Sequence, residues 1–384
     1  MLFTTPEPTV KEIKVVQDIE TIRKNLQYML SRPARWYGYL RRSTLAKNIR
    51  GSNSIEGYEV TNEDAVAAVA QEEPEEAEQE AWLAVVGYRN AMTYVLQLSK
   101  DPHFVYNDGF LKSLHFMMVQ HDLRKHPGTW RPGPIYVRDE QKNETVYEGP
   151  PAEQVPKLMQ TLVEELNLGA GTVPVLIRAA MAHLNLTMIH PFSDGNGRMA
   201  RCLQTLVLGR EEILEPEFCS IEEYLGRNTQ EYYAVLANVG QGAWHPENDT
   251  RAWVQFCLTA HFRQAASLVK RAREMDRVWG ELEIELKRLR LPDRMIPALA
   301  DAAFGYKVRN STYRTAAGLN KIMASRDLKI LCDHELLVPS GERRGRSYVA
   351  SESVKAIRER TKEPKVITDP FVDDTAVVPG LSSN

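Results

Sequence analysis

Glycine and proline, the residues that interrupt helices, gather in a few short stretches of this chain and do not recur at short, regular intervals. The long intervals between them carry apolar residues at helical spacing, which predicts a mainly α-helical protein and disfavours an all-β sandwich. With 43% hydrophobic and 26% charged residues, the composition is globular and excludes wholesale disorder. A length of 384 residues indicates two or three domains.

Charge and cysteine content narrow the class of protein further. A net charge of −3 argues against a chain devoted to bulk electrostatic binding of nucleic acid, although one basic module remains compatible with it. The sequence contains neither an apolar run long enough to span a bilayer nor a secretory signal, so we expect a cytoplasmic protein without a membrane segment. The four cysteines form no CxxC pair, which favours reduced thiols over disulfides or a zinc site.

The N-terminal part of the chain reads as helices with one acidic interruption. Helical patterning covers residues 12–70, broken at Pro33, and resumes at 81–98. Between them, QEEPEEAEQE (71–80) fits the start of the second segment, with Pro74 at its first helical position and the acidic residues offsetting the helix dipole. An acidic segment that recruits a basic partner is the alternative.

The next interruption predicts a β-hairpin between helices. Residues 126–151 contain Pro–Gly and Gly–Pro dipeptides around the strand-like segment IYVR (135–138) and a second short segment, TVY (145–147). Helices then resume at Val155 and continue, with loops, to about Met275.

Residues 281–350 look like a separate module. The pattern predicts three helical segments and then a short hairpin with a basic tip, which is the order of a winged helix-turn-helix: 281–290, 312–319, 323–335 and the hairpin LLVPSGERRGRSYVA (336–350). The module holds thirteen Lys and Arg against nine Asp and Glu, so it could contact phosphates of DNA. Because Asp327, Asp333 and Glu335 would repel DNA, we favour target docking or dimerisation. Residues 362–384 are rich in Pro, Asp, Ser and Thr and show little patterning, which predicts a disordered tail.

The segment that carries chemistry is a polar loop between two apolar helices, within residues 173–210. The loop HPFSDGNG (190–197) follows the first helix, which should end at His190 because a residue before proline is pushed out of the α region. Gly195 and Gly197 permit unusual backbone angles and close approach, and Asn196 tolerates the left-handed region.

The loop leads into the N-terminus of the second helix, where unpaired N–H groups and the dipole favour an anion. Arg198 and Arg201 lie three residues apart on one side of that helix and suit phosphate oxygens. Asp194 supplies an oxygen ligand for Mg²⁺, and His190 supplies a base that is neutral at pH 7. The combination points to phosphoryl or nucleotidyl transfer. A Rossmann reading fails because the glycines follow a helix, and no Walker A sequence is present.

The segment HPFSDGNGRMAR (190–201) resembles the signature of the Fic (Fido) family, HxFx(D/E)GNGRxxR, at every specified position. The resemblance extends over about 107–265 and implies a helical core with a β-hairpin flap. Members mostly transfer AMP from ATP to a Ser, Thr or Tyr hydroxyl of a protein. By this resemblance we expect a catalytic core at 107–275, preceded by a helical region at 1–106.

The resemblance implies a role for each matching residue. His190 is similar to the general base, Phe192 to the core anchor of the loop and Asp194 to the Mg²⁺ ligand. The phosphate ligands implied are Gly195, Asn196, Gly197, Arg198 and Arg201. The hairpin residues Ile135, Tyr136, Val137 and Arg138 resemble a flap that pairs with the target and lines the nucleotide pocket. The segment NTQEYYAVL (228–236) resembles the adenine-side helix, with Tyr232 or Tyr233 near the base.

Upstream, Ser52 and Glu56 lie four residues apart on one helical face, and Gly57 fits a helix stop. Alone, this pattern describes a helix end with a surface glutamate. Beside a Fic core it resembles the inhibitory motif (S/T)xxxE(G/N), which implies that Glu56 pairs with Arg201 in the place of the γ-phosphate.

Three functions remain in view from the sequence. The first is a self-inhibited protein adenylyltransferase that uses ATP and Mg²⁺ and acts on a protein target, which can include the protein itself, with a homodimer as one arrangement. The second is removal of AMP, or both reactions, at the same residues. The third is a nucleotide-sensing regulator that binds DNA through residues 281–350; the intact His190 favours catalysis over sensing.

Overall fold

The computed structural model describes residues 1–31, 35–74, 76–139, 144–169, 171, 173–211, 214–341, 346–364 and 368–372. Within these ranges the protein is mainly helical with two short hairpins, which confirms the predicted fold class. The predicted break at Pro33 and the arginines of the predicted hairpin tip, Arg343 and Arg344, lie outside the described residues. No helix in the described ranges is long and apolar enough to span a membrane.

In the described part of the N-terminal half there are five α-helices and the first hairpin. Their bounds are α1 (Val10–Ser31), α2 (Tyr37–Ile55), α3 (Asn62–Ala70), α4 (Gln79–Leu98), α5 (Asp108–Val119), β1 (Tyr136–Asp139) and β2 (Glu144–Glu148), with a short 3-10 helix at Leu123–Lys125. β1 and β2 pair antiparallel, with an irregularity between Val137 and Arg138. This is the hairpin expected within 126–151.

The predicted role of Pro74 is wrong. Helix α3 ends with Gln71 in the left-handed conformation, and Glu72 N–H donates back to the Ala67 carbonyl at 2.9 Å. Pro74 therefore follows a helix C-terminus, where proline is common, and α4 begins later, at Gln79.

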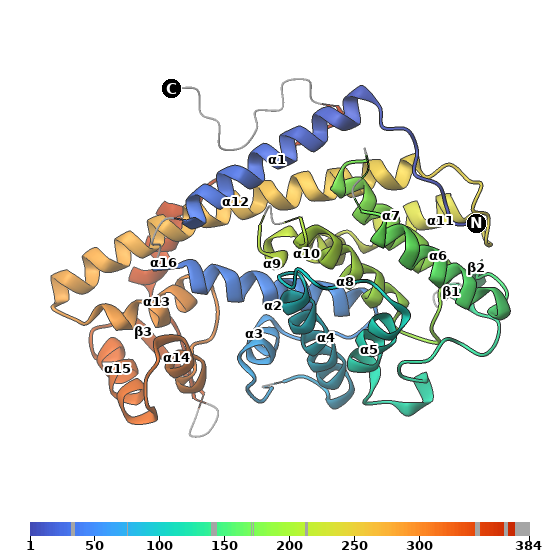
Figure 1. Cartoon of the computed structure of the whole chain (residues 1–384). Helices are drawn as coiled ribbons and strands as arrows, with labels where there is room; N and C mark the ends of the chain where they lie inside the picture. Colours follow the sequence, from blue (N-terminus) through green and yellow to red (C-terminus); the bar gives the residue numbers. More distant parts are fainter. Residues whose placement is uncertain are drawn as a thin grey trace.

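The central helices are α6 (Val155–Asn167), α7 (Val175–Ile189), α8 (Asn196–Gly209), α9 (Pro216–Cys219), α10 (Glu222–Arg227) and α11 (Thr229–Gly240). Helices α7 and α8 pack against each other and are buried along almost their whole length. The loop that joins them, residues 190–195, is therefore held on both sides by the core. Helix α1 lies alongside the long helix α12 (Arg251–Leu289) over the top of the molecule (Figure 1).

Helix α2, which carries Ser52, is fixed by a close backbone contact with α10. A Cβ on Gly51 would lie 2.5 Å from the Glu222 carbonyl oxygen, and one on Gly226 would lie 2.6 Å from the Cα of Gly51. Only glycine fits at either position without moving a helix. This contact sets where the C-terminal end of α2, with Ser52, is placed.

The C-terminal part differs from the prediction in its helix boundaries. The predicted break between Met275 and 281 is absent, because buried Val278 and Leu282 continue the apolar stripe and α12 ends only at Leu289. It is followed by α13 (Ile296–Ala303), α14 (Asn310–Ala317), α15 (Lys321–Asp333), β3 (Leu337–Ser340), β4 (Ser347–Ala350) and α16 (Glu352–Thr361). Helices α14 and α15 and the hairpin were expected; α13 and α16 were not. The winged-helix assignment stays a prediction.

Part of the predicted tail packs on the body of the protein. Glu363 forms ion pairs with Arg273 and Arg277, and the Thr368 carbonyl accepts from Arg263 Nε at 3.1 Å. The expectation of disorder is therefore wrong for the described residues 362–364 and 368–372, and the remainder of 362–384 lies outside the described residues.

Candidate active site

His190 lies at the C-terminal end of α7, where one of its two ring nitrogens is held by the backbone. Its φ is +51°, the left-handed region, which takes it out of the helix before Pro191 as predicted. Nδ1 donates to the Thr187 carbonyl at 3.0 Å, so the neutral ring carries its lone pair on Nε2. Burial lowers the pKa of His190, which keeps the ring neutral at pH 7 and able to accept a proton.

The loop after His190 is braced by its own side chains. Phe192 is fully buried and stacks on His115, with ring centroids 3.8 Å apart. Asn196 Nδ2 donates to the Phe192 carbonyl and its Oδ1 accepts from Phe192 N–H, both at 2.9 Å. The Asn196 side chain thus holds the loop closed, and only its backbone N–H remains for the anion-binding role that the sequence implied.

The N-terminus of α8 already faces a carboxylate. Gly195 caps the helix with φ +77°, and α8 begins at Asn196, so its first N–H groups lack acceptors within the helix. A Cβ on Gly197 would overlap Glu56 Oε1. The Glu56 carboxylate therefore occupies the position at which these N–H groups and the helix dipole would hold an anion.

Arg201 joins this helix to the end of α2. Its Nη2 donates to Glu56 Oε1 at 2.7 Å and to the Ser52 carbonyl at 2.9 Å, and its Nε donates to Ser52 Oγ at 2.7 Å. Burial lowers the pKa of Arg201, but the charge of Glu56, its hydrogen bond and the nearby tyrosines Tyr232 and Tyr88 together outweigh burial, so the pKa is raised. The pairing of Glu56 with Arg201 that the resemblance implied is thus present in the structure.

Both arginines of the motif keep unused donors. Arg198 and Arg201 side chains are fully buried, and Nε and Nη1 of Arg198 and Nη1 of Arg201 have no hydrogen-bond partner in the described ranges. Buried donors without acceptors are costly, so these three groups are suited to receive oxygen atoms of a bound anion.

Asp194 presents a carboxylate beside the same helix end. Its Oδ1 accepts from Gly195 N–H at 2.7 Å and its Oδ2 lies 2.9 Å from Lys125 Nζ. Burial would raise the pKa of Asp194, but Arg198, Lys125 and the Gly195 N–H outweigh it and the pKa is lowered. An ionised single carboxylate fits Mg²⁺, which uses one or two carboxylates together with substrate phosphates. No group of three metal-ligating side chains occurs among the described residues.

Two residues near Asp194 were missed by sequence reasoning. Lys125 Nζ also donates a hydrogen bond to the Tyr58 hydroxyl at 2.6 Å, and the Arg198 guanidinium lies 5.1 Å from the Tyr58 ring centroid. Tyr58 directly follows the Glu56–Gly57 pair, so its position next to the motif was the available signal. Lys125 carried none, because its partners are far away in the sequence.

The hairpin is anchored beside His190 by Arg131, which sequence reasoning also missed. Arg131 is buried, and its Nε donates to the His190 carbonyl at 2.8 Å while its Nη2 donates to the Pro150 carbonyl at 2.5 Å. Tyr147 of β2 donates to the Met188 carbonyl at 2.7 Å. Both ends of the hairpin are thereby tied to the last turn of α7.

The remaining predicted residues divide into exposed and buried ones. On the hairpin, Tyr136 and Arg138 are exposed, whereas Ile135 and Val137 are half-buried. On α11, Tyr232 is 1% exposed and its hydroxyl bonds His183 Nε2 at 2.9 Å within the core. Tyr233 is 48% exposed, and its hydroxyl donates to the Ile55 carbonyl at the end of α2. Of the two tyrosines, Tyr233 is the one that faces solvent beside Glu56, and the adenine-side role stays a prediction.

Comparison with known proteins gives a consistent result. Residues 107–208 match the model of the Fic/DOC family. The chain is 39% identical over 90 residues to protein adenylyltransferase fic-1 of Caenorhabditis elegans, and 33% identical over 94 residues to a probable protein adenylyltransferase of Aquifex aeolicus. These matches cover 23% and 24% of this chain, and only 16% and 27% of the two relatives.

Two solved structures share the fold over a larger part of the chain. A Fic family protein from Desulfovibrio desulfuricans aligns with a TM-score of 0.57 at 23% identity and covers 91% of this chain and 98% of its own. A Fic-domain-containing signaling protein from Bacteroides thetaiotaomicron aligns with a TM-score of 0.56 at 22% identity, over 66% of this chain and 96% of its own. The filled motif at 190–201, the helical fold and these matches together place residues 107–208 of this chain in the Fic/DOC family.

Proposed function

We propose that this protein is a protein adenylyltransferase that transfers AMP from ATP to a side-chain hydroxyl of a target protein. Two relatives carry that activity in their names, and the matched segment includes the motif. The observation that carries the proposal is the arrangement around the 190–201 loop. A neutral histidine, a helix N-terminus with unused arginine donors and an ionised aspartate lie within one short loop and the first turn of α8.

His190 is the proposed general base. Its Nε2 takes the proton of the attacking Ser, Thr or Tyr hydroxyl while the new oxygen–phosphorus bond forms at the α-phosphate. The bond from that phosphorus to the bridging oxygen breaks, and pyrophosphate leaves. The Thr187 carbonyl holds Nδ1–H, so the ring keeps its orientation as it becomes positive.

The phosphates would lie against the start of α8. Its N–H groups and the buried donors of Arg198 and Arg201 favour the β- and γ-phosphates. Asp194 is the proposed Mg²⁺ ligand, and the ion, when bound, would neutralise charge that develops on the leaving pyrophosphate. For the aspartate to bind it, Lys125 has to give up the Oδ2 contact.

Glu56 is the proposed inhibitor of the same site. Its carboxylate faces Gly197 and Arg201, where the end of the triphosphate would otherwise lie. Two negative groups do not share one pocket, so ATP either displaces Glu56 or binds with its α-phosphate out of line with His190. The isolated protein is then largely self-inhibited.

The exposed edge of the hairpin is the proposed docking site for the target. Among the residues that the structure describes, β1 pairs with β2 alone, and Tyr136 and Arg138 on it are exposed. An extended target segment could pair with such an edge by main-chain hydrogen bonds, which would bring its hydroxyl close to His190.

The proposal is tested by transfer of labelled AMP to protein in the presence of ATP and Mg²⁺. We expect Glu56→Gly to label at least tenfold faster than wild type, and Glu59→Gly, which removes an exposed glutamate three residues away, to behave as wild type. His190→Ala in the Glu56→Gly background should abolish labelling. Equal rates for wild type and Glu56→Gly would remove the inhibitory role, and labelling without His190 would remove its role as base.

Removal of AMP from a modified protein is a second candidate. Only one oxygen of Glu56 is bound to Arg201, and its side chain is 20% exposed, so the other oxygen is available to orient a water. Incubation of wild type and Glu56→Gly with a pre-modified target separates the reactions. Release of AMP by wild type alone would assign hydrolysis to Glu56.

A further inference from the structure

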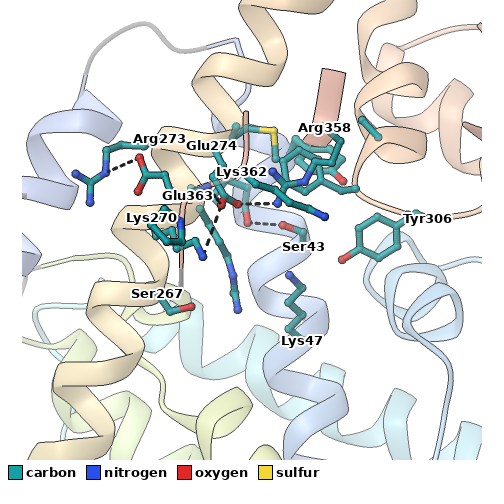
Figure 2. A pocket seen from close by; sticks show the side chains of 18 of the residues that line it. Ser43, Lys47, Ser267, Lys270, Arg273, Glu274, Tyr306, Arg358, Lys362 and Glu363 are labelled. Atoms are coloured by element: carbon teal, nitrogen blue, oxygen red, sulfur yellow. Dashed lines mark hydrogen bonds and ion pairs between the residues drawn. The ribbon is translucent and has the colours of Figure 1, made fainter. Parts of the chain in front are cut away.

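A large cavity lies away from the candidate active site, between α2, α12, α13 and α16. Its volume is about 1370 Å³, and none of residues 190–201 line it. Figure 2 shows lysine, arginine and glutamate side chains pointing into it, with Lys47 coming from α2, Lys270 from α12 and Arg358 from α16. Neither the family motif nor the proposed reaction uses these residues.

The lining of this cavity is strongly basic. Nine lysines and arginines face it against four glutamates, in a chain whose overall net charge is −3. Two of these glutamates already form ion pairs: Glu274 with Lys270 and Arg358, and Glu363 with Arg273. The positive excess is therefore not neutralised from within the cavity.

Lys47 is the least compensated of these cations. Its ammonium is half-buried and has no hydrogen bond or ion pair with any residue in the described ranges. Charged groups face it from three elements: Arg271 on α12, Glu223 and Arg227 on α10, and Arg358 on α16. Glu223 is itself bound by Arg271 and Arg227. Burial, with Arg271 as the next cause, lowers the pKa of Lys47 to about 8.

Two arginines that line the same cavity as Lys47 also have charges or donors that are not fully compensated. Within the described part of the chain, Arg263 bonds only neutral oxygens, the Thr368 carbonyl and the Tyr224 hydroxyl, each at 3.1 Å. Arg358 binds Glu274 at 2.7 Å, but its Nη1 is buried without a partner in the described ranges. Together with Lys47, these two arginines line the same cavity from three helices, α2, α12 and α16.

We propose that this cavity binds a small anion carrying several phosphate groups, held by Lys47, Arg263 and Arg358. Several anionic oxygens are needed, because the cations come from three different helices. A nucleic acid duplex fits less well, because the side chains of Arg271 and Arg358 are only 15% and 16% exposed and lie recessed from the surface. Binding of an anion here can be measured whether or not the protein is an adenylyltransferase.

Titration calorimetry with inorganic tripolyphosphate tests the site. We expect Lys47→Met and Arg263→Gln each to weaken binding about tenfold or more, as for loss of one charge-assisted hydrogen bond. The control, Arg288→Gln, removes an exposed arginine that forms an ion pair with Glu285 and does not line the cavity, and it should bind as wild type. Melting temperatures of all variants in the absence of ligand check that each is folded.

An active-site variant separates the two anion sites. Arg198→Gln should leave binding in the cavity intact, because Arg198 does not line it. Binding that is lost in Arg198→Gln and kept in Lys47→Met would assign the anion to the start of α8 and overturn the proposal. A DNA duplex that binds through Lys47 and is not displaced by tripolyphosphate would overturn it as well.

Proton uptake is a second readout that a merely structural lysine would not give. A bound anion stabilises the charged ammonium, so at pH 8 wild type should take up as much as about half a proton on binding. Titrations in two buffers of different ionisation enthalpy measure this uptake. The proton balance of Lys47→Met, measured with the same anion, should be lower by this amount; an equal balance in wild type and variant would show that Lys47 does not contact the anion.

Discussion

Replacing Glu56 with glutamine should change stability and ATP response in opposite directions. The substitution preserves the size of the side chain and removes the charge that faces Arg201, whose side chain is fully buried. Loss of one partner of a buried pair costs about 3–5 kcal/mol. Here Glu56 is 20% exposed and Ser52 still accepts two hydrogen bonds from Arg201, so we expect a cost of about 2 kcal/mol.

Binding of ATP and Mg²⁺ should recover this loss. Once the carboxylate is gone, the place beside Gly197 is open to phosphate oxygens, and a ligand present at 100 times its Kd stabilises the folded protein by about 2.7 kcal/mol. Wild type gains less, because Glu56 competes for the same donors. The variant is therefore less stable than wild type without ligand and at least as stable with it.

Thermal unfolding with and without ATP and Mg²⁺ measures both effects. For a chain of this length, about 2 kcal/mol corresponds to a fall in Tm of roughly 2–4 °C. Glu59→Gln, which changes an exposed glutamate, serves as the control and should follow wild type in both conditions. If wild type and Glu56→Gln show the same Tm increase on adding ligand, Glu56 does not compete with the triphosphate.

Two further predictions concern the supports of the site. Gly51→Ala should push α2 away from α10, lower the Tm and raise AMP labelling. The control is Gly38→Ala on the same helix, where a Cβ meets only Arg42 at 3.6 Å; it should leave the Tm and the labelling unchanged. Equal labelling by the two variants would contradict the proposed role of the Gly51 contact. Burial lowers the pKa of His115 to about 4, so folding favours its neutral form and stability falls as the pH drops below 6.5. Between pH 7.5 and pH 5 the free energy of unfolding of wild type, measured in urea, should fall by about 2 kcal/mol more than that of His115→Gln. Equal falls would show that His115 does not cause the loss of stability at low pH.

Local signals in the sequence were sufficient for the parts of the fold that depend on neighbouring residues. The end of α7 at His190 follows from Pro191, and the hairpin follows from the Pro–Gly dipeptides around it. Pro74 was misassigned because the same residue type marks both helix starts and helix ends. Here the left-handed conformation of Gln71 ends α3 before Pro74, and the sequence does not reveal that conformation.

Contacts between distant segments were beyond sequence reasoning. Arg131 and Lys125 reach the His190 loop from residues about 60 to 70 positions away, and nothing in their own surroundings marks them. Tyr232 and Tyr233 are adjacent, so spacing alone could not assign which one enters the core. The cavity around Lys47 has the same origin, because its charges come from helices that are separated in the sequence and meet only in the folded protein.

Helix α2 connects the two sites through its own stiffness. Lys47 faces the basic cavity and Glu56 follows the last turn, nine residues later, which is about 13 Å along a helix. Between them, Gly51 contacts α10 closely, so a rigid displacement of the whole of α2 that separates Glu56 from Arg201 would also disturb this glycine contact. Such a displacement would move Lys47 relative to Arg263 and Arg358, which belong to other helices. An anion that bridges these cations therefore holds α2 in place, and by the same linkage it favours the state in which Glu56 occupies the end of α8.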